Sequence, residues 1–440
     1  MTPHALPAAA AAAPAASRSR ARARIVLYTL CAVYVLNFLD RSLLAILAKP
    51  IQDTLHISDG QLGLIGGLYF AFFYCFIAIP IGWLADKTHR VNVLSAACAI
   101  WSVATAACGL ATSYPRLVVS RMLVGVGEAG GVPPSYALIT DYFPPGQRGA
   151  AFGVYNLGPP IGAALGIAFG AAIAAAFNWR DAFIDIGGVG ILAAVAIRLI
   201  VREPPRGGLD ATPAAAASAP SRFWTTVRMF FSHPALVLAA LGSGITQLVT
   251  YGVGNFTTLF LMREKGMTLD QVAVYYALVV GIAMSAGMLV SGRMLDRFIR
   301  RSKSAYAILP ATSLTLAIPF YLGFVWAPSW HLSLPLLAAP MFLNYFYLAS
   351  SIALVQEEVR PDQRVMAGAL LLLVMNFIGL GLGPTYVGAA SDFFHAGHPQ
   401  HSLQLALYTM TPFYVIAIVI FLCLARILRG ESRSTGGVPR

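Results

Sequence analysis

Twelve apolar stretches, each long enough to cross a lipid bilayer as a helix, constrain this chain more than any other feature of its sequence. A soluble domain carries about 25% charged residues, whereas this chain carries 11%. Inside hydrocarbon every backbone N–H and C=O group must be paired, and a helix pairs them within one segment. The sequence therefore predicts an all-α integral membrane protein. The expected spans are residues 25–48, 62–84, 91–113, 116–138, 149–177, 181–201, 236–262, 271–294, 305–327, 332–357, 366–390 and 403–428.

These stretches divide the chain into five parts. We expect a disordered tail at 1–24, a six-helix bundle at 25–201, a linker at 202–234, a second bundle at 235–428 and a second tail at 429–440. In the first tail the basic residues follow an Ala-rich tract, which is unlike a secretory signal, although the Arg-rich, acid-free start also resembles a transit peptide.

Aromatic residues and arginines alternate near the end of the linker, at 221–231. This mixture predicts a helix lying on the membrane surface. The alternative interpretation is that the seventh span begins there.

Positive charge is distributed unevenly between the connecting segments. Of the 30 Lys and Arg residues, 23 fall on the side that holds both tails, five fall on the other side, and Arg41 and Arg121 lie inside spans. Since cytoplasmic segments carry the excess of Lys and Arg, we expect both termini in the cytoplasm. The membrane that we expect is a bacterial inner membrane. Topology thus accounts for the net charge of +12, and no nucleic-acid partner is expected.

The two halves repeat one another at matching positions. Residues 82–87, at the end of the second span, correspond to residues 292–297 at the end of the eighth, with an offset of 210. Pro-Gly-Gln-Arg at 145–148 corresponds to Pro-Asp-Gln-Arg at 361–364, with an offset of 216. Internal duplication of this kind is typical of secondary transporters, which place the substrate site between the repeats.

Several motifs resemble those of the major facilitator superfamily. They are the loop at 82–90, an Arg followed by spaced glycines at 121–129, and the Gly-Pro step at 158–159. The resemblance implies a major facilitator fold of twelve transmembrane helices in two pseudo-symmetric six-helix bundles. More narrowly, the segments 37–41, 127–129 and 144–149 resemble the Spinster branch, whose characterised members move lysolipids or sphingosine phosphate.

The same resemblance assigns conformational gating to cytoplasmic loop residues. A relay in which Asp86 and Arg90 meet Asp141 and Arg148 is expected, although this loop departs from the usual pattern at 87, 89 and 91. The full set of implied gating residues is Gly82, Asp86, Arg90, Asp141, Arg148, Asp296 and Arg297.

Four charged residues lie inside the spans of the first half. Asp40 and Arg41 fall in the first span, while Arg121 and Glu128 lie seven residues apart on one face of the fourth. Each such charge costs about 2.5–3.5 kcal/mol at mid-membrane, so four unpaired charges would cost about 10 kcal/mol or more. They are therefore expected to pair or to line water. Tight helix packing, rather than dinucleotide binding, is the interpretation of the glycines at 125–130 and of those spaced by four at 158–170.

The first span presents two faces. Tyr34, Asn37 and Arg41 share one face by their spacing, whereas Asp40 points about 100° away and so addresses other neighbours. One interpretation of these charges is a static ion-pair staple. The other is a relay in which Asp40 and Glu128 carry protons and the arginines hold an anionic headgroup, since burial raises a carboxyl pKa and a nearby Arg lowers it. The Spinster resemblance implies the same roles.

The second half has no charge near mid-span, but it offers polar side chains that would face a cavity or bond neighbouring helices. In the seventh span, Gln247, Tyr251 and Asn255 are spaced by four and share a face, with Thr250 beside them. The further cavity residues expected are Asn344, Tyr347 and Asn376.

Together these patterns predict a monomeric, proton-coupled transporter of an amphipathic and anionic lipid-like substrate, working by alternating access. The alternatives are an organic-anion or drug exporter and, from another class, a non-transporting receptor or scaffold. No enzyme activity, cofactor or metal is expected. Three histidines at 395, 398 and 401 are spaced like ligands, but the proline at 399 interrupts a helix there and solvated loop histidines are the simpler interpretation.

Overall fold

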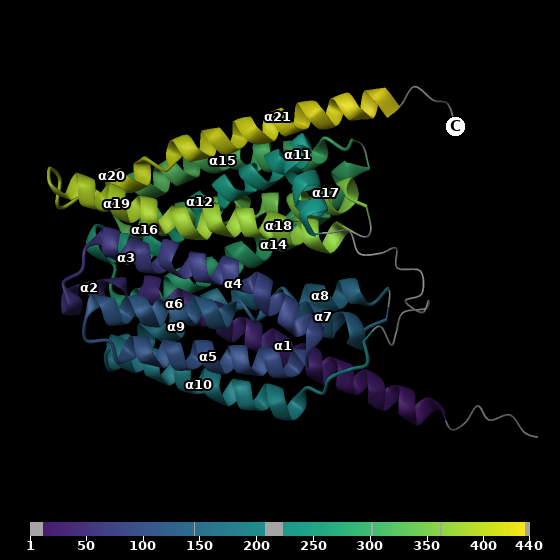
Figure 1. The fold of residues 1–440 in the computed structure, drawn as a ribbon. Helices are drawn as coiled ribbons and strands as arrows, with labels where there is room; N and C mark the ends of the chain where they lie inside the picture. The colour runs from purple at the N-terminus through teal and green to yellow at the C-terminus, as the bar shows by residue number, and fades with distance from the viewer. Residues whose placement is uncertain (1–11, 145, 207–222, 301, 361–362, 436–440) are drawn as a thin grey trace, which may run out of the picture.

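The chain folds into helices that run alongside one another in two bundles (Figure 1). The computed structural model describes residues 12–144, 146–206, 223–300, 302–360 and 363–435, and no strand occurs among them. The start of the first helix and the end of the last one project from the same end of the molecule. An even number of crossings explains this placement of the termini.

Among the described residues, the first bundle contains ten helices that form six spans. They are α1 (Ala12–Ile46), α2 (Ala48–Leu55), α3 (Asp59–Gly66), α4 (Leu68–Lys87), α5 (Arg90–Gly109), α6 (Tyr114–Glu128), α7 (Val132–Tyr142), α8 (Arg148–Tyr155), α9 (Gly158–Ala176) and α10 (Trp179–Ile200).

The second bundle follows α11 (Phe223–Ser232) and repeats this plan. Its elements are α12 (Pro234–Arg263), α13 (Leu269–Gln271), the π-helical turn η2 (Val272–Tyr276), α14 (Ala277–Ile299), α15 (Ala305–Trp326), α16 (Trp330–Leu343), α17 (Phe346–Glu358), α18 (Arg364–Asn376), the π-helical turn η4 (Phe377–Leu382), α19 (Gly383–His395), α20 (Ser402–Tyr408) and α21 (Thr411–Thr435).

Eleven segments of the described chain are long and apolar enough to cross a membrane. The remaining predicted span, at 116–138, is divided between α6 and α7, which have 15 and 11 residues. The break follows Glu128 directly, where two glycines precede two prolines at 133–134. Pro cannot donate the helical hydrogen bond, and Gly tolerates the irregular backbone. The fourth span is therefore a broken helix with a charged residue at its break.

Both tails are more ordered than their composition suggested. Residues 12–24, which were expected to belong to a disordered tail, are part of α1, and residues 429–435 are part of α21; residues 1–11 and 436–440 lie outside the described residues. Ala and Arg are strong helix formers and extend the helices beyond their apolar parts. In the linker, α11 ends before His233 and is separate from α12, which confirms a distinct helix at the end of the linker.

Helices α1 and α9 pack so closely that glycine is required between them. A Cβ on Gly162 would lie 2.3 Å from the carbonyl oxygen of Val35, and one on Gly166 would lie 2.6 Å from that of Leu39. Gly158 and Gly170 meet side chains of α1 in the same way. This contact confirms that the glycine spacing serves helix packing, and it fixes α1 within the bundle.

The bundles are tied together at the end opposite the termini. Helices α3 and α19 cross there with almost no gap, because a Cβ on Gly63 would lie 2.4 Å from the carbonyl oxygen of Pro384 and one on Gly388 would lie 2.3 Å from that of Asp59. Asp392 of α19 accepts hydrogen bonds from the hydroxyl of Ser58 and the backbone N–H of Gly60, at 2.6 and 3.0 Å. This end of the molecule is therefore closed between the bundles.

Candidate functional site

A cavity of about 140 Å³ lies between the two bundles. The first bundle contributes Arg41 and Arg121, and the second contributes Thr250, Tyr251 and Asn255. The remaining wall is mostly apolar and aromatic, with Phe38, Phe70, Tyr276, Met284, Met341 and Tyr345 among its residues. No Asp or Glu belongs to the described lining, so the charge that faces the cavity is positive.

The two adjacent charges of α1 address different helices, as their spacing predicts. Arg41 donates from Nε to Oε2 of Glu128 on α6. Asp40 turns toward α5, where its Oδ2 accepts a hydrogen bond from the hydroxyl of Thr105. The sequence reasoning did not name Thr105 as the partner of Asp40, because hydroxyl residues are too common in membrane helices to mark a partner.

Arg121 lies on the face of α6 that borders the cavity, and its side chain is 2% exposed. Its guanidinium lies 5.1 Å from the centre of the Phe70 ring, a ring that Arg41 also approaches at 5.3 Å. Tyr74 lies 4.4 Å from the Arg41 guanidinium. Aromatic faces stabilise both cations without neutralising them. The two arginines are thereby held at one wall of the cavity.

Several buried polar atoms around this wall have no hydrogen-bond partner among the described residues. They include Nε and Nη1 of Arg121, Oδ1 of Asp40, Oε1 of Glu128 and Oδ1 of Asn37. A buried donor or acceptor without a partner costs about 1–3 kcal/mol, and more when it is charged. The arrangement therefore has hydrogen-bonding capacity left for a ligand, a proton or water.

The predicted polar residues of the second bundle divide into two groups. Tyr251 and Asn255 line the cavity, and Gly66 of α3 lies so close to Asn255 that an added Cβ would be 2.8 Å from its Oδ1. Asn344 instead donates to the hydroxyl of Tyr414 at 3.0 Å, and Gln247 packs against Gly379. Four further candidates do not line the cavity either: Tyr34, Asn37, Tyr347 and Asn376.

The loop residues expected to control gating form a cluster around Arg90. Its Nη1 contacts Oδ2 of Asp141 at 2.5 Å, and its Nε contacts Oε1 of Glu203 at 2.7 Å. Glu203 also accepts the backbone N–H of Val91 at 3.0 Å. The expected pairing of Arg90 with Asp141 is present, and the first residues of the linker join it through Glu203, which the motif comparison had not included.

The other gating candidates have different surroundings. Arg148 donates from Nε to the backbone carbonyls of Thr140 and Phe143, each at 3.0 Å. Asp296 and Arg297 are exposed at the end of α14, and Gly82 lies within α4. The side chain of Asp86 lies outside the described residues.

An ion pair joins the two bundles at the closed end, and the sequence reasoning missed it. Arg263 of α12 donates to both carboxylate oxygens of Asp59 on α3, at 3.1 and 2.8 Å. Asp59 also accepts from Ser391 at 2.6 Å and from Gln52 at 2.7 Å. Both charges lie at the ends of their spans, where charged residues are common, and the order of the chain gives no sign that they meet.

The comparisons agree with this architecture. The sequence profile of the Major Facilitator Superfamily matches residues 30–384, and the chain belongs to this family of membrane transporters. The predicted fold class of two six-helix bundles is thereby confirmed. The chain is multi-pass, and the family and fold are those of transporters rather than enzymes.

Among its relatives, the chain is 31% identical over 364 residues to an MFS-type efflux pump of Mycolicibacterium smegmatis, covering 82% of this chain and 83% of that one. It is 28% identical over 404 residues to protein spinster homolog 1 of Bos taurus, covering 86% and 75%. A crystal structure of a bacterial homologue of the human lysosomal transporter Spinster, inward-facing and unoccupied, matches with a TM-score of 0.85 at 29% identity over 93% of this chain and 98% of that one. The resemblance to Spinster proteins is confirmed.

Proposed function

We propose that the chain is a proton-coupled secondary transporter of an amphipathic and anionic substrate, of the lysolipid or sphingosine-phosphate type. The observation that carries this proposal is the asymmetric wall of the central cavity. Two arginines face the cavity, whereas the acids nearest to them, Asp40 and Glu128, are not among the lining residues. Such a wall attracts an anion, while the acids that balance the arginines lie inside the first bundle, away from the cavity.

The anionic part of the substrate binds at Arg121 in this proposal. A guanidinium donates hydrogen bonds to a phosphate or carboxylate from more than one nitrogen, and Nε and Nη1 of Arg121 have no protein partner among the described residues. Arg41 is engaged by Glu128 and adds positive potential at the same wall. The aromatic residues opposite, Tyr251 and Tyr345, contact the apolar part of the substrate.

Protons are carried by Asp40 and Glu128. Each carboxylate is buried and uses one oxygen for a partner, Thr105 or Arg41, while its second oxygen has no hydrogen-bond partner in the described part of the chain. A substrate anion that draws Arg41 toward the cavity weakens the pair with Glu128, and a carboxylate that loses its cation in a dry site gains a proton. Substrate binding and proton binding then act on one electrostatic network.

The described state is closed at the end opposite the termini, and we propose that this end is the external one. The positive-inside count supports a cytoplasmic location for the termini. Alternating access then requires the contacts of α3 with α19 and of Asp59 with Arg263 to open while the cytoplasmic side closes. The two bundles move about the cavity that lies between them.

An organic-anion or drug exporter is the second candidate. The central cavity, with a volume of about 140 Å³, holds a headgroup or a small organic anion. It is smaller than the pockets of about 300–1,000 Å³ that hold drug-sized ligands. The similarity to an efflux pump favours the same alternative. A non-transporting scaffold is disfavoured because it has no use for buried charges of this cost.

Reconstitution in proteoliposomes with an imposed pH gradient tests the proposal. Lysophosphatidic acid, a small organic anion and a cationic drug would be offered in parallel, each with and without an ionophore that collapses the gradient. Gradient-dependent flux of the lysolipid supports the proposal, and flux of the organic anion or the drug alone supports the second candidate. Absence of flux for all three, with the gradient in either direction, would support the scaffold.

A further inference from the structure

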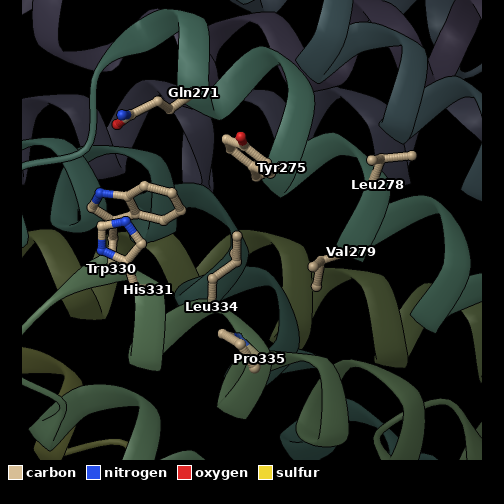
Figure 2. Close-up of a pocket in the computed structure, with 8 residues that line it drawn as sticks. All are labelled: Gln271, Tyr275, Leu278, Val279, Trp330, His331, Leu334 and Pro335. Atoms are coloured by element: carbon tan, nitrogen blue, oxygen red, sulfur yellow. The ribbon is translucent and has the colours of Figure 1, made fainter.

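A second and larger cavity lies on the outer side of the second bundle, between the first turns of the α13–η2–α14 span and the first turns of α16 (Figure 2). Its volume is about 600 Å³, within the range of ligand pockets. It shares no lining residue with the central cavity. Both of its walls begin at the end of the molecule opposite the termini.

The two ends of this groove differ in chemistry. One end is lined by Gln271, Tyr275, Trp330 and His331, whose side chains carry polar groups. Trp330 stacks on His331 with ring centroids 3.7 Å apart, and the ring of Tyr275 lies tilted against Trp330 with centroids 5.4 Å apart. Tyr and Trp are the residues enriched where a membrane meets water. This end therefore suits the headgroup level of the bilayer.

The other end of the groove is apolar. Leu278, Val279, Leu334 and Pro335 line it, and Figure 2 shows them on the far side of the aromatic stack from Gln271. Eight residues of helix separate Gln271 from Val279, which is about 12 Å along the axis. The groove thus runs from the membrane boundary into the hydrocarbon, becoming apolar with depth.

The π-helical turn η2 separates the groove from the central cavity. Tyr275 is 50% exposed and lines the groove, whereas its neighbour Tyr276 is 3% exposed and lines the central cavity. One helix thereby presents adjacent tyrosines to two different spaces. π-Helical turns are rare and occur frequently at functional sites.

We propose that this groove binds one acyl chain of a phospholipid from the leaflet opposite the termini. The surface around it is lipid-facing, because Leu278 is 57% exposed and Ile282, one turn deeper, is 68% exposed on a membrane-spanning helix. The bilayer is the medium that such a surface meets. The donors of Gln271, Tyr275 and Trp330 face phosphate and ester oxygens, which accept hydrogen bonds, and no Asp or Glu in the described lining repels them.

A photoactivatable phosphatidylglycerol, with a diazirine in its acyl chain, tests the assignment on the full-length protein in nanodiscs. We expect the adducts to map to residues 271–279 and 330–335 and to saturate with label. Leu278→Trp fills the groove and is expected to lower this labelling at least about tenfold, the equivalent of 1.4 kcal/mol. Ile282→Trp is the matched control, because it adds the same ring to the same lipid-facing side, and it should leave the labelling unchanged.

Tyr275→Ala is the second variant, since it removes part of the polar end without adding bulk. It should weaken labelling at 330–335, and thermal unfolding would report whether each variant is folded. The proposal would be overturned if labelling were equal along the whole exposed face and unchanged by Leu278→Trp, because such labelling is what bulk lipid produces. Displacement of the label by an equimolar lysophosphatidic acid would overturn it too, since the groove would then take the transported substrate rather than a resident phospholipid. Neither result depends on the central site, so the proposed transport function is tested separately.

Discussion

Asp59 holds the two bundles together at the closed end, and replacing it with Asn should open that end. Asp59 accepts two hydrogen bonds from the guanidinium of Arg263 and one from the hydroxyl of Ser391. All three hydrogen bonds connect it to the second bundle. Asn has an NH2 donor in place of one carboxylate oxygen acceptor. This donor would face the N–H donors of the guanidinium. The pair loses both its charge attraction and one hydrogen bond.

The size of the effect follows from these contacts. A hydrogen bond to a charged group contributes about 1.5–3 kcal/mol, and breaking a buried pair costs about 3–5 kcal/mol. Since the Arg263 side chain is 27% exposed, solvent screens the pair and the lower range applies. A loss of about 1.5–3 kcal/mol shifts the equilibrium between closed and open states about ten- to a hundredfold toward the open one.

Pulsed EPR between spin labels at Thr112 and His398, in a cysteine-free background, measures this equilibrium. The two sites are exposed and lie at the closed end on different bundles. Asp59→Asn should add a longer-distance population. Asp53→Asn is the matched control, because Asp53 lies at the same end and its ion pair among the described residues is with Lys49, one helical turn away in the same helix. Identical distance distributions for the two variants would refute the reasoning.

Three further predictions concern the site, the packing and the pH dependence. Arg121→Gln should lower the affinity for the anionic substrate about ten- to a hundredfold while the protein remains folded, as measured by ligand-induced thermal stabilisation, and an unchanged affinity would remove Arg121 from the site. Gly162→Val should destabilise the fold by about 1–3 kcal/mol, because the new side chain meets the Val35 carbonyl, and unchanged thermal unfolding would contradict the packing. Burial raises the pKa of Glu264, which lies outside the spans. The contribution of Glu264 to folding stability is therefore complete below the pKa that it has in the unfolded chain, and it is lost as the pH rises through the higher pKa of the folded protein. Glu264→Gln should therefore gain stability relative to the wild type as the pH rises from 4 to 7, and parallel melting profiles would contradict this.

The architecture was predictable from the sequence because its physical signals are local. Long apolar segments and the distribution of Lys and Arg follow from what a bilayer permits, and the repeat of residues 82–87 at 292–297 can be seen directly in the sequence. The four-residue spacing of glycines from Gly158 to Gly170 predicted tight packing, which the contact with α1 confirms. The length of the terminal helices was not predicted, since the Ala- and Arg-rich composition of residues 12–24 is compatible with both a disordered tail and a helix.

The charged network was predictable only in part. Rare residues inside spans could be recognised one by one, and the helical angle between Asp40 and Arg41 correctly separated their neighbours. Thr105 could not be chosen from the many hydroxyl residues of the spans. The pairing of Asp59 with Arg263 depends on how two distant helices meet, which no local pattern encodes. Likewise, Tyr251 and Asn255 line the cavity, whereas Gln247 and Asn344 contact neighbouring helices. Which of these residues face the cavity depends on how the helices pack.

Proton movement coupled to substrate movement is the central claim, and Asp40→Asn tests it most directly. Wild-type proteoliposomes containing a pH-sensitive dye should acidify or alkalinise when substrate is added, and an imposed pH gradient should drive substrate accumulation. Asp40→Asn keeps the size of the side chain and its contact with Thr105 but cannot exchange a proton, so we predict that it abolishes both effects while substrate binding persists. Asp53→Asn, on the exposed surface, should behave as the wild type. Gradient-driven accumulation by Asp40→Asn at the wild-type level would contradict the account.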